Sequence, residues 1–455
     1  MTVSAATLAA FRADIAGIAC QDDPKTLALK SRDYFWYSPI LSDLLEGMTG
    51  QLVVQPRDEA EVIRIAAAAA RHRVPLTVRG GGTGNYGQCV PMEGGVIVEL
   101  TKLDQITDIQ PGRVVCGAGA RIERVEQAVA QTGQMLSMFP STKRLATMGG
   151  FIAGGSGGIG SLRHGMLRDG GNVGYIRVVT VDLKPQVIDL KAADILQVQH
   201  AYGTNGIITA LDYALVPATD WLHCAALFDG YGQALTFAAA AQDSGLDSYL
   251  MTVVERRFSR FYKRLQDVFP RDLDAVFSMV APDAIPDFAA LVARFGGSIS
   301  LQKTLHDMEE ANLPPAWECG WNHTTLQALK LEPTVWTYLQ VAYPQPFDPA
   351  LVLRQMARYG DEVLMHHEMA RMGGAVQIFA LPLLKWASRA RIYEIIAEME
   401  ALDGCTIYDP HVITIEDGGM KEIDQAQINF KKRADPYGLM NPGKTRAWTA
   451  DMARR

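Results

Sequence analysis

Hydrophobic and polar positions predict short buried strands that alternate with amphipathic helices from residue 52 onward. Short apolar runs bounded by Gly, Pro or charged residues are typical of buried strands, and apolar positions three and four apart are typical of helices. Strands are predicted at 52–56, 74–80, 94–100, 113–118, 175–183 and 206–216. Helices are predicted at 59–73, which Asp58 can cap, and at 121–133, which Gly133 can close.

Pro217 marks a predicted domain boundary, because the pattern after it changes to mixed helices and strands. A helix is predicted at 232–245 and a strand at 248–258. Near the C-terminus a helix is predicted to break at Asp435-Pro436, since the residue before a proline disfavours helical backbone angles. We therefore predict a nucleotide-type domain at 1–217, a substrate domain at 218–420 and a C-terminal return to the first domain at 421–455.

Composition restricts the class of partner. The chain has 455 residues with a net charge of −7, and 48% of its residues are hydrophobic. This charge gives no basic surface for nucleic acid or an anionic membrane, so we expect a small-molecule substrate, with a homo-oligomer left open. The six cysteines are scattered, and no secretory start or apolar run of about 18 residues is present. We expect a cytoplasmic protein.

Two glycine-rich stretches match familiar nucleotide-binding patterns in letters only. Gly82, Gly84 and Gly87 fit GxGxxG, but Pro91 and a glycine pair at 94–95 follow where a Rossmann fold needs a helix. Proline costs about 3 kcal/mol inside a helix and glycine about 1 kcal/mol. Residues 438–445 fit GxxxxGK[ST], but they follow a charged helix and precede only ten residues. We exclude a Rossmann site and a P-loop.

The glycines still predict a ligand. Seven glycines lie between residues 80 and 95, and seven more between residues 149 and 160. Glycine lets successive backbone N–H groups converge on an anion. One such stretch is as easily a flexible surface turn. Two stretches flanked by buried strands favour one large anionic ligand touched at two places.

Taken in order, these segments resemble the FAD-binding oxidoreductases of the vanillyl-alcohol oxidase and p-cresol methylhydroxylase (PCMH) type. The resemblance covers residues 52–217 and returns at 434–444, and it rests on LVVQPRDEAEVIRI, VPLTVRGGGTGNYGQ, GQMLSMFPSTKRLATMGGFIAGGSGGIGSLRHG, AYGTNGIITALDYALVP and ADPYGLMNPGK. It implies an α+β fold, with a two-subdomain FAD-binding domain and an α+β cap domain over the substrate. FAD is the implied cofactor, and no metal is expected because an HGDGN-like motif is missing.

The resemblance assigns cofactor-binding residues by position. They are Arg79, Gly80, Gly81, Gly82, Thr83, Gly84, Asn85, Tyr86, Gln88, Pro140, Thr147, Met148, Gly149, Gly150, Gly154, Ile208, Asn441 and Lys444. The glycine loop would contact the pyrophosphate, residues 140–154 would follow the ribityl chain and the flavin ring, and Lys444 would place a cation near the cofactor. Tyr86 stands where relatives with covalently bound flavin usually have a histidine, so the mode of attachment stays open.

Four residues are candidates for handling the substrate proton. His323 lies beside two tryptophans in PAWECGWNHTTL, an environment suited to a flat or apolar substrate. His366 is predicted on a helix in LMHHEMARMGG, and His411 on a strand in YDPHVITIEDGG. Asp169 matches a position where some relatives place an acid beside flavin N5. For each, a purely structural role is the alternative: a satisfied core histidine, an exposed polar face or a turn aspartate.

The sequence thus predicts an FAD-dependent oxidase or dehydrogenase. It would oxidise a small alcohol, hydroxyacid or amine by hydride transfer to flavin N5, and pass the electrons to oxygen or another acceptor. Two rivals remain: a non-redox, flavin-assisted transferase of the same fold, and a flavin-binding protein without catalysis.

Overall fold

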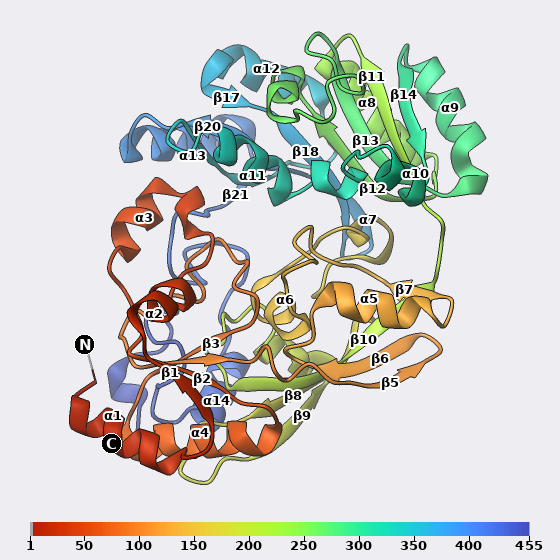
Figure 1. Cartoon of the computed structure of the whole chain (residues 1–455). Helices are drawn as coiled ribbons and strands as arrows, with labels where there is room; N and C mark the ends of the chain where they lie inside the picture. The colour runs from red at the N-terminus through yellow and green to blue at the C-terminus, as the bar shows by residue number, and fades with distance from the viewer. Residues whose placement is uncertain (1–2, 455) are drawn as a thin grey trace. The chain divides into compact units, whose positions relative to one another are not determined.

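The computed structural model describes residues 3–454, which form two compact units. The first unit comprises the residues up to 156, residues 170–218 and the residues from 411 onward. The second comprises residues 157–169 and 219–410. Figure 1 labels helices and strands of both units.

A mostly parallel sheet carries the glycine loop in the first unit. Its order is β1-β2-β4-β3, with β1 (Ala19–Gln21), β2 (Leu52–Gln55), β3 (Leu76–Arg79) and β4 (Val96–Glu99). Strands β2 and β3 both pair in parallel with β4, and β1 is antiparallel to β2. The segment between β3 and β4 contains no helix, which confirms that this is not a Rossmann turn.

A six-stranded antiparallel sheet completes the first unit. Its order is β5-β6-β10-β8-β9, with β7 pairing at the end of β10. The strands are β5 (Ile106–Gln110), β6 (Arg113–Gly117), β7 (Gln134–Leu136), β8 (Val173–Val179), β9 (Val187–Lys191) and β10 (Ile207–Pro217). The predicted pairing of 175–183 with 206–216 is confirmed, since Leu211 lies opposite Ile176 in the register.

Seven α-helices of the first unit lie within residues 3–454, and α4 among them has the apolar face and the N-terminal cap that its sequence predicts. They are α1 (Ala5–Asp14), α2 (Pro24–Lys30), α3 (Pro39–Leu45), α4 (Glu59–His72), α5 (Ile122–Ala130), α6 (Met148–Gly154) and α14 (Gln425–Ala434). Asp58 caps α4 as predicted, because its carboxylate accepts the N–H of Glu61 at 2.8 Å. Helix α4 buries Val62 and Ile65 fully.

The second unit is built on an eight-stranded sheet of order β14-β11-β13-β12-β18-β19-β16-β21. The strands are β11 (Leu222–Phe228), β12 (Ser248–Val254), β13 (Asp274–Val280), β14 (Ser298–Lys303), β16 (Gln340–Ala342), β18 (His366–Met372), β19 (Ala375–Ala380) and β21 (Thr406–Tyr408). A separate small sheet pairs β15 (Trp336–Tyr338), β20 (Leu383–Lys385) and β17 (Val363–Leu364).

One face of the eight-stranded sheet forms the main core of the second unit. Val253, Met369 and Ala380 on this face belong to one cluster of buried apolar residues, together with residues of α8 (Tyr231–Asp243), α12 (Pro349–Tyr359) and α13 (Arg389–Asp403). Figure 1 shows α9 (Ile285–Arg294) alongside β14 at the sheet edge. The remaining helices of this unit are α7 (Ser161–His164), α10 (Leu305–Glu310) and α11 (Asn322–Leu331).

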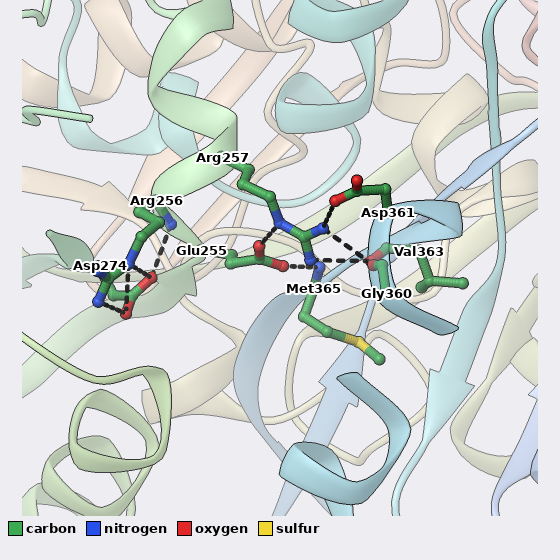
Figure 2. A network of polar contacts seen from close by, with 8 residues as sticks. All are labelled: Glu255, Arg256, Arg257, Asp274, Gly360, Asp361, Val363 and Met365. Atoms are coloured by element: carbon green, nitrogen blue, oxygen red, sulfur yellow. Dashed lines mark hydrogen bonds and ion pairs between the residues drawn. The ribbon is translucent and has the colours of Figure 1, made fainter. Parts of the chain in front are cut away.

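A polar network ties the end of β12 to the segment that enters β18. Figure 2 shows the Arg257 guanidinium between the carboxylates of Glu255 and Asp361. The other oxygen of Glu255 accepts the N–H of Met365 at 2.8 Å. Glu255 is buried, and burial raises the pKa of its carboxyl group although Arg257 opposes that shift.

The predicted α+β class is confirmed, but two local predictions are wrong. The segment around His366 was expected to be a helix, but it is strand β18. Most of this strand is buried on both faces, so its sequence lacks the alternation of polar and apolar residues that would have identified a strand. Gly373 and Gly374 have positive φ and form a two-residue turn to β19, which is the signal that was missed. The strand expected through His411 ends at Tyr408, because Asp409-Pro410 breaks it.

No helix among residues 3–454 is both long and apolar enough to cross a membrane.

Candidate functional site

The glycine loop after β3 packs directly against a second loop of the first unit. A Cβ on Gly80 would lie 2.1 Å from Oγ1 of Thr147, and a Cβ on Gly81 would lie 2.0 Å from the carbonyl oxygen of Leu145. No side chain fits at these distances, so glycine is required here by close approach. The two stretches that the sequence predicted to share a ligand therefore lie side by side.

Backbone donors in this loop are free to bind an anion. Within the part of the chain that the structure describes, the N–H groups of residues 80–84 make no hydrogen bond to another residue. Gly82 has φ of +66°, and the loop after it turns back so that the Gly84 carbonyl accepts the N–H of Tyr34 at 2.7 Å. A run of open N–H groups on a constrained loop is an anion-binding concavity.

The second loop ends in helix α6. The Thr147 side chain accepts the N–H of Gly150 at 3.2 Å and caps the helix. Met148 and Gly149 donate their N–H groups to the carbonyls of Ala120 and Ala118 at 2.9 Å and 2.8 Å. These bonds fix the start of α6 beside the glycine loop.

The C-terminal segment returns to the same place. Asn441, with φ of +42°, donates from Nδ2 to the carbonyls of Gln88 at 2.8 Å and Tyr202 at 2.6 Å. Gln88 in turn donates to the carbonyl of Gly154 at 3.2 Å. Three segments distant in sequence thus meet through Gln88.

A lysine ammonium group is buried in this cluster without a partner. Lys444 is 0% exposed, and its Nζ makes no hydrogen bond to any residue among 3–454. It lies 3.8 Å from the position that a Cβ of Gly87 would occupy. A buried cation without a hydrogen-bond partner is costly, and this favours an anionic ligand at the site.

An acidic residue that the sequence analysis missed accompanies this lysine. Burial raises the pKa of Asp33 to about 6, against the opposing effect of the Lys444 charge. Burial lowers the pKa of Lys444 to about 8, against the effect of Asp33. Asp33 accepts the N–H of Phe35 at 2.9 Å and of Cys89 at 3.4 Å. The only sequence signal was a charged residue before the aromatic run YFWY.

Arg79 has a structural role in this arrangement. Its guanidinium donates to the carbonyl of Lys30 at 3.1 Å and also to that of Arg32. A Cβ on Gly82 would collide with the same guanidinium at 2.0 Å. Arg79 therefore joins the N-terminal segment to the glycine loop.

The remaining cofactor candidates lie on the same unit. Tyr86 stacks on Tyr202 with ring centroids 6.3 Å apart, and Thr83 accepts a 3.4 Å hydrogen bond from Thr142 near Pro140. Ile208 is a buried residue of β10 next to Thr209, whose carbonyl accepts the N–H of Ala118.

Three of the four catalytic candidates lie in the second unit. Asp169 accepts the N–H of Met166 at 2.9 Å and of Gly373 at 3.2 Å, so it fixes a loop to the β18–β19 turn. His366 is fully buried, with Nε2 2.7 Å from Glu368. His323 is half-buried on the first turn of α11.

His411 belongs instead to the first unit. It is 1% exposed, and its Nδ1 lies 2.7 Å from Oγ of Ser38, the cap of α3. Ser38 Oγ also accepts the N–H of Leu41 at 3.1 Å, and its hydroxyl proton stays available for the bond to the imidazole, so either His411 Nδ1 or Ser38 Oγ can be the donor in that bond. Across residues 3–454, no three His, Cys, Asp or Glu side chains are grouped so as to hold a metal ion.

Comparison with known proteins gives matches over part of the chain, most of it in the first unit. Residues 50–183 match a family model described as an FAD binding domain. A D-lactate dehydrogenase of Archaeoglobus fulgidus is 34% identical over 119 residues, which cover 26% of this chain and 27% of that protein. The glycolate oxidase subunit GlcD of Escherichia coli is 32% identical over 174 residues, which cover 36% of this chain and 34% of the subunit. The matches thus span about a third or less of these relatives.

Likeness of fold extends further than likeness of sequence. A solved structure of an alkyldihydroxyacetonephosphate synthase superimposes with a TM-score of 0.72. It covers 96% of this chain and 86% of the synthase, at 13% sequence identity. At that identity the match is one of fold alone.

Proposed function

We propose that the chain belongs to the PCMH-type FAD-binding oxidoreductases and that it is an FAD-dependent oxidase or dehydrogenase. Its substrate is a small alcohol, hydroxyacid or amine. The observation that carries this proposal is the buried, unpartnered Lys444 ammonium beside a glycine loop with open N–H groups. The names of the sequence relatives, a dehydrogenase and an oxidase subunit, support the redox chemistry.

The residues present fit FAD. The N–H groups of 80–84 would hold the diphosphate, and glycine is required at Gly80 and Gly81 by the close approach of the second loop. Lys444 would neutralise negative charge on the cofactor. Thr147 and Gly149 would line its length, because they lie against the glycine loop and Ala118.

Bound FAD supplies a ring that accepts two electrons from the substrate carbon as hydride. The chain itself must orient the substrate and accept its proton. We place the proton acceptor at His323, since this residue is only half-buried, whereas His366 and His411 are fully buried and Asp169 is engaged by backbone N–H groups. The vanillyl-alcohol oxidase subgroup, the electron acceptor and a cytoplasmic location remain predictions from the sequence.

The test is an anaerobic screen of the purified protein. We expect a yellow protein with bound FAD whose visible absorbance is bleached by at least one alcohol, hydroxyacid or amine. A His323→Gln variant should bind FAD normally but bleach about 100-fold more slowly, the usual size of a general-base contribution. A protein that binds FAD but is bleached by no compound would instead be a flavin-binding protein without this activity.

The transferase alternative is less well supported. The likeness to the synthase is one of fold alone, and Arg256 and Arg257 in the basic run at 256–264 of the substrate domain are paired with Asp274 and Glu255. Turnover of such a substrate without flavin bleaching would favour it.

A further inference from the structure

Trp321 has a strained backbone at the start of helix α11. Its φ of +51° and ψ of −144° lie in a region that almost only glycine adopts. It occupies the N-cap position, and its own side chain makes no capping hydrogen bond. Such a conformation persists only where the surroundings impose it, and strained residues cluster at ligand-binding sites.

A fully buried carboxylate imposes this conformation. Glu368 on β18 accepts the Trp321 N–H at 2.6 Å, and this bond caps α11 from a distant strand. The same carboxylate oxygen lies 2.9 Å from the Thr252 hydroxyl and 2.7 Å from Nε2 of His366. Glu368, His366 and Thr252 are all 0% exposed.

The first turn of α11 is fixed from a second side. The Thr324 hydroxyl donates to the carbonyl of Cys319 at 2.6 Å and accepts from the Tyr262 hydroxyl at 3.0 Å. All these groups are buried within the second unit. The segment around Trp321 therefore has one well-defined position.

The Trp321 indole packs on an apolar wall of the same unit. This wall consists of Met166, Ala342, Ala370 and Phe379, with Met372, Tyr408 and Trp321 packed against it half-buried. Phe379 is the register partner of Glu368, and Ala342 is the partner of Phe379, so these residues share one sheet face. This is the face opposite the main core of the unit.

The wall has the chemistry of a substrate surface. Phe379 and Tyr408 have ring centroids 6.5 Å apart. Ala342 and Ala370 contribute only small apolar side chains to the same cluster. Apolar and aromatic side chains of this kind predominate in the lining of small-molecule sites. Trp321 borders this surface by virtue of its strained backbone.

We propose that Glu368 is a positioning residue that holds Trp321 as the specificity wall of the substrate site, and that this wall selects a substrate with a flat apolar body. The inference rests on the proposed oxidation of a small organic substrate, and it goes further by assigning the group that selects it. Glu368 acts through Trp321, and takes no part in the redox step.

The test compares two alcohols that differ only in planarity, benzyl alcohol and cyclohexylmethanol. Calorimetric titration of the FAD-loaded full chain should show benzyl alcohol binding about tenfold more tightly. Trp321→Gly should abolish that preference, and it should lower the melting temperature, because the lost packing of the indole outweighs the relief of backbone strain. A purely structural tryptophan would lose the same stability but leave the ratio of the two affinities unchanged.

The role of Glu368 is tested in the same binding assay. Glu368→Leu removes the acceptor for the Trp321 N–H and should abolish the preference although the indole is still present. Glu368→Gln retains an acceptor oxygen and should retain the preference. Trp336→Phe, at a buried tryptophan of the small sheet, is the matched control and should bind both alcohols as the wild type does.

Three outcomes would overturn the inference: neither alcohol binds the wild type, Trp321→Gly keeps the preference, or Glu368→Leu keeps it. Each is distinguishable from failure of the proposed function. Flavin bleaching by some other compound would leave that function standing, whereas a wild type that no compound bleaches would refute it whatever the variants do.

Discussion

A lysine ammonium group without a partner in a protein interior costs free energy unless an anion is bound next to it. Lys444 is in this position, and Asp33 is the acidic group that interacts with it. The two residues are far apart in sequence and meet only because the C-terminal segment returns to the glycine loop. At the residue scale, we expect this pair to make FAD binding sensitive to charge and to pH.

We predict that Lys444→Met weakens FAD binding by about 10- to 100-fold, the value of one hydrogen bond to a charged group. The measurement is quenching of FAD fluorescence on titration of the apoprotein. Lys432→Met removes an exposed lysine from α14 and serves as the control. Equal affinities of the two variants would contradict the role of Lys444.

FAD affinity should also fall as the pH rises above about 8. Burial lowers the pKa of Lys444 to about 8 in the apoprotein, so the ammonium that attracts the anion is progressively lost above that pH. The affinity of the wild type should be level from pH 6.5 to 7.5 and decline from pH 8 to 9. Lys444→Met should show no such decline.

Asp33 predicts a separate pH dependence of apoprotein stability. Burial raises the pKa of its carboxyl group to about 6, above the ordinary value near 4. The folded state therefore holds this proton more tightly, and the stabilisation is present below pH 4 and is lost as the pH rises through about 6. Thermal melts of wild type and Asp33→Asn should diverge across this window, with the wild type losing stability relative to the variant.

At the scale of elements, the polar network of Figure 2 holds β12 to the strand that carries Glu368. Arg257 pairs with the buried Glu255 and with the exposed Asp361, and it donates to the carbonyls of Gly360 and Val363. The exposed half of this network is worth little, but the buried half leaves an uncompensated carboxylate when it is broken.

Arg257→Ala should accordingly lower the free energy of unfolding by about 3 kcal/mol, as measured by urea denaturation. Arg354→Ala breaks an exposed pair with Asp348 at 3.5 Å, and should cost less than about 1 kcal/mol. Similar losses in the two variants would show that the buried contact has no special weight.

At the scale of the whole molecule, the chain forms two compact units, and the groups discussed above are distributed between them. The glycine loop, the second loop and the C-terminal return all belong to the first unit, and the strained Trp321 with its wall belongs to the second. A ligand that binds one folded unit stabilises that unit by mass action.

FAD at a free concentration of 100 times its dissociation constant should therefore raise the free energy of unfolding of the first unit by about 2.7 kcal/mol. Differential scanning calorimetry should show one transition that moves up with FAD and a second that depends on it less. A single transition that does not move would contradict the assignment of the site.

Local sequence determined much of the fold. Apolar periodicity located β2, β3, β4 and α4, and the Asp58 cap was predictable because capping depends on residues three positions apart. The glycine loop without a following helix was also predictable, since proline and glycine exclude a helix on local grounds. The same reasoning failed at β18, because a strand buried on both faces loses the alternation that identifies strands.

Only the tertiary structure decided which side chains meet. The orphan Lys444 beside Asp33, and the Glu368 carboxylate on the Trp321 N–H, join segments that no local pattern connects. Periodicity and propensity act within about one turn or one strand, whereas burial and hydrogen-bond partners depend on elements hundreds of residues apart. The sequence by itself therefore determined the fold class and a glycine loop without a following helix, and the packing of distant elements decided the charge at that loop and the apolar wall in the second unit.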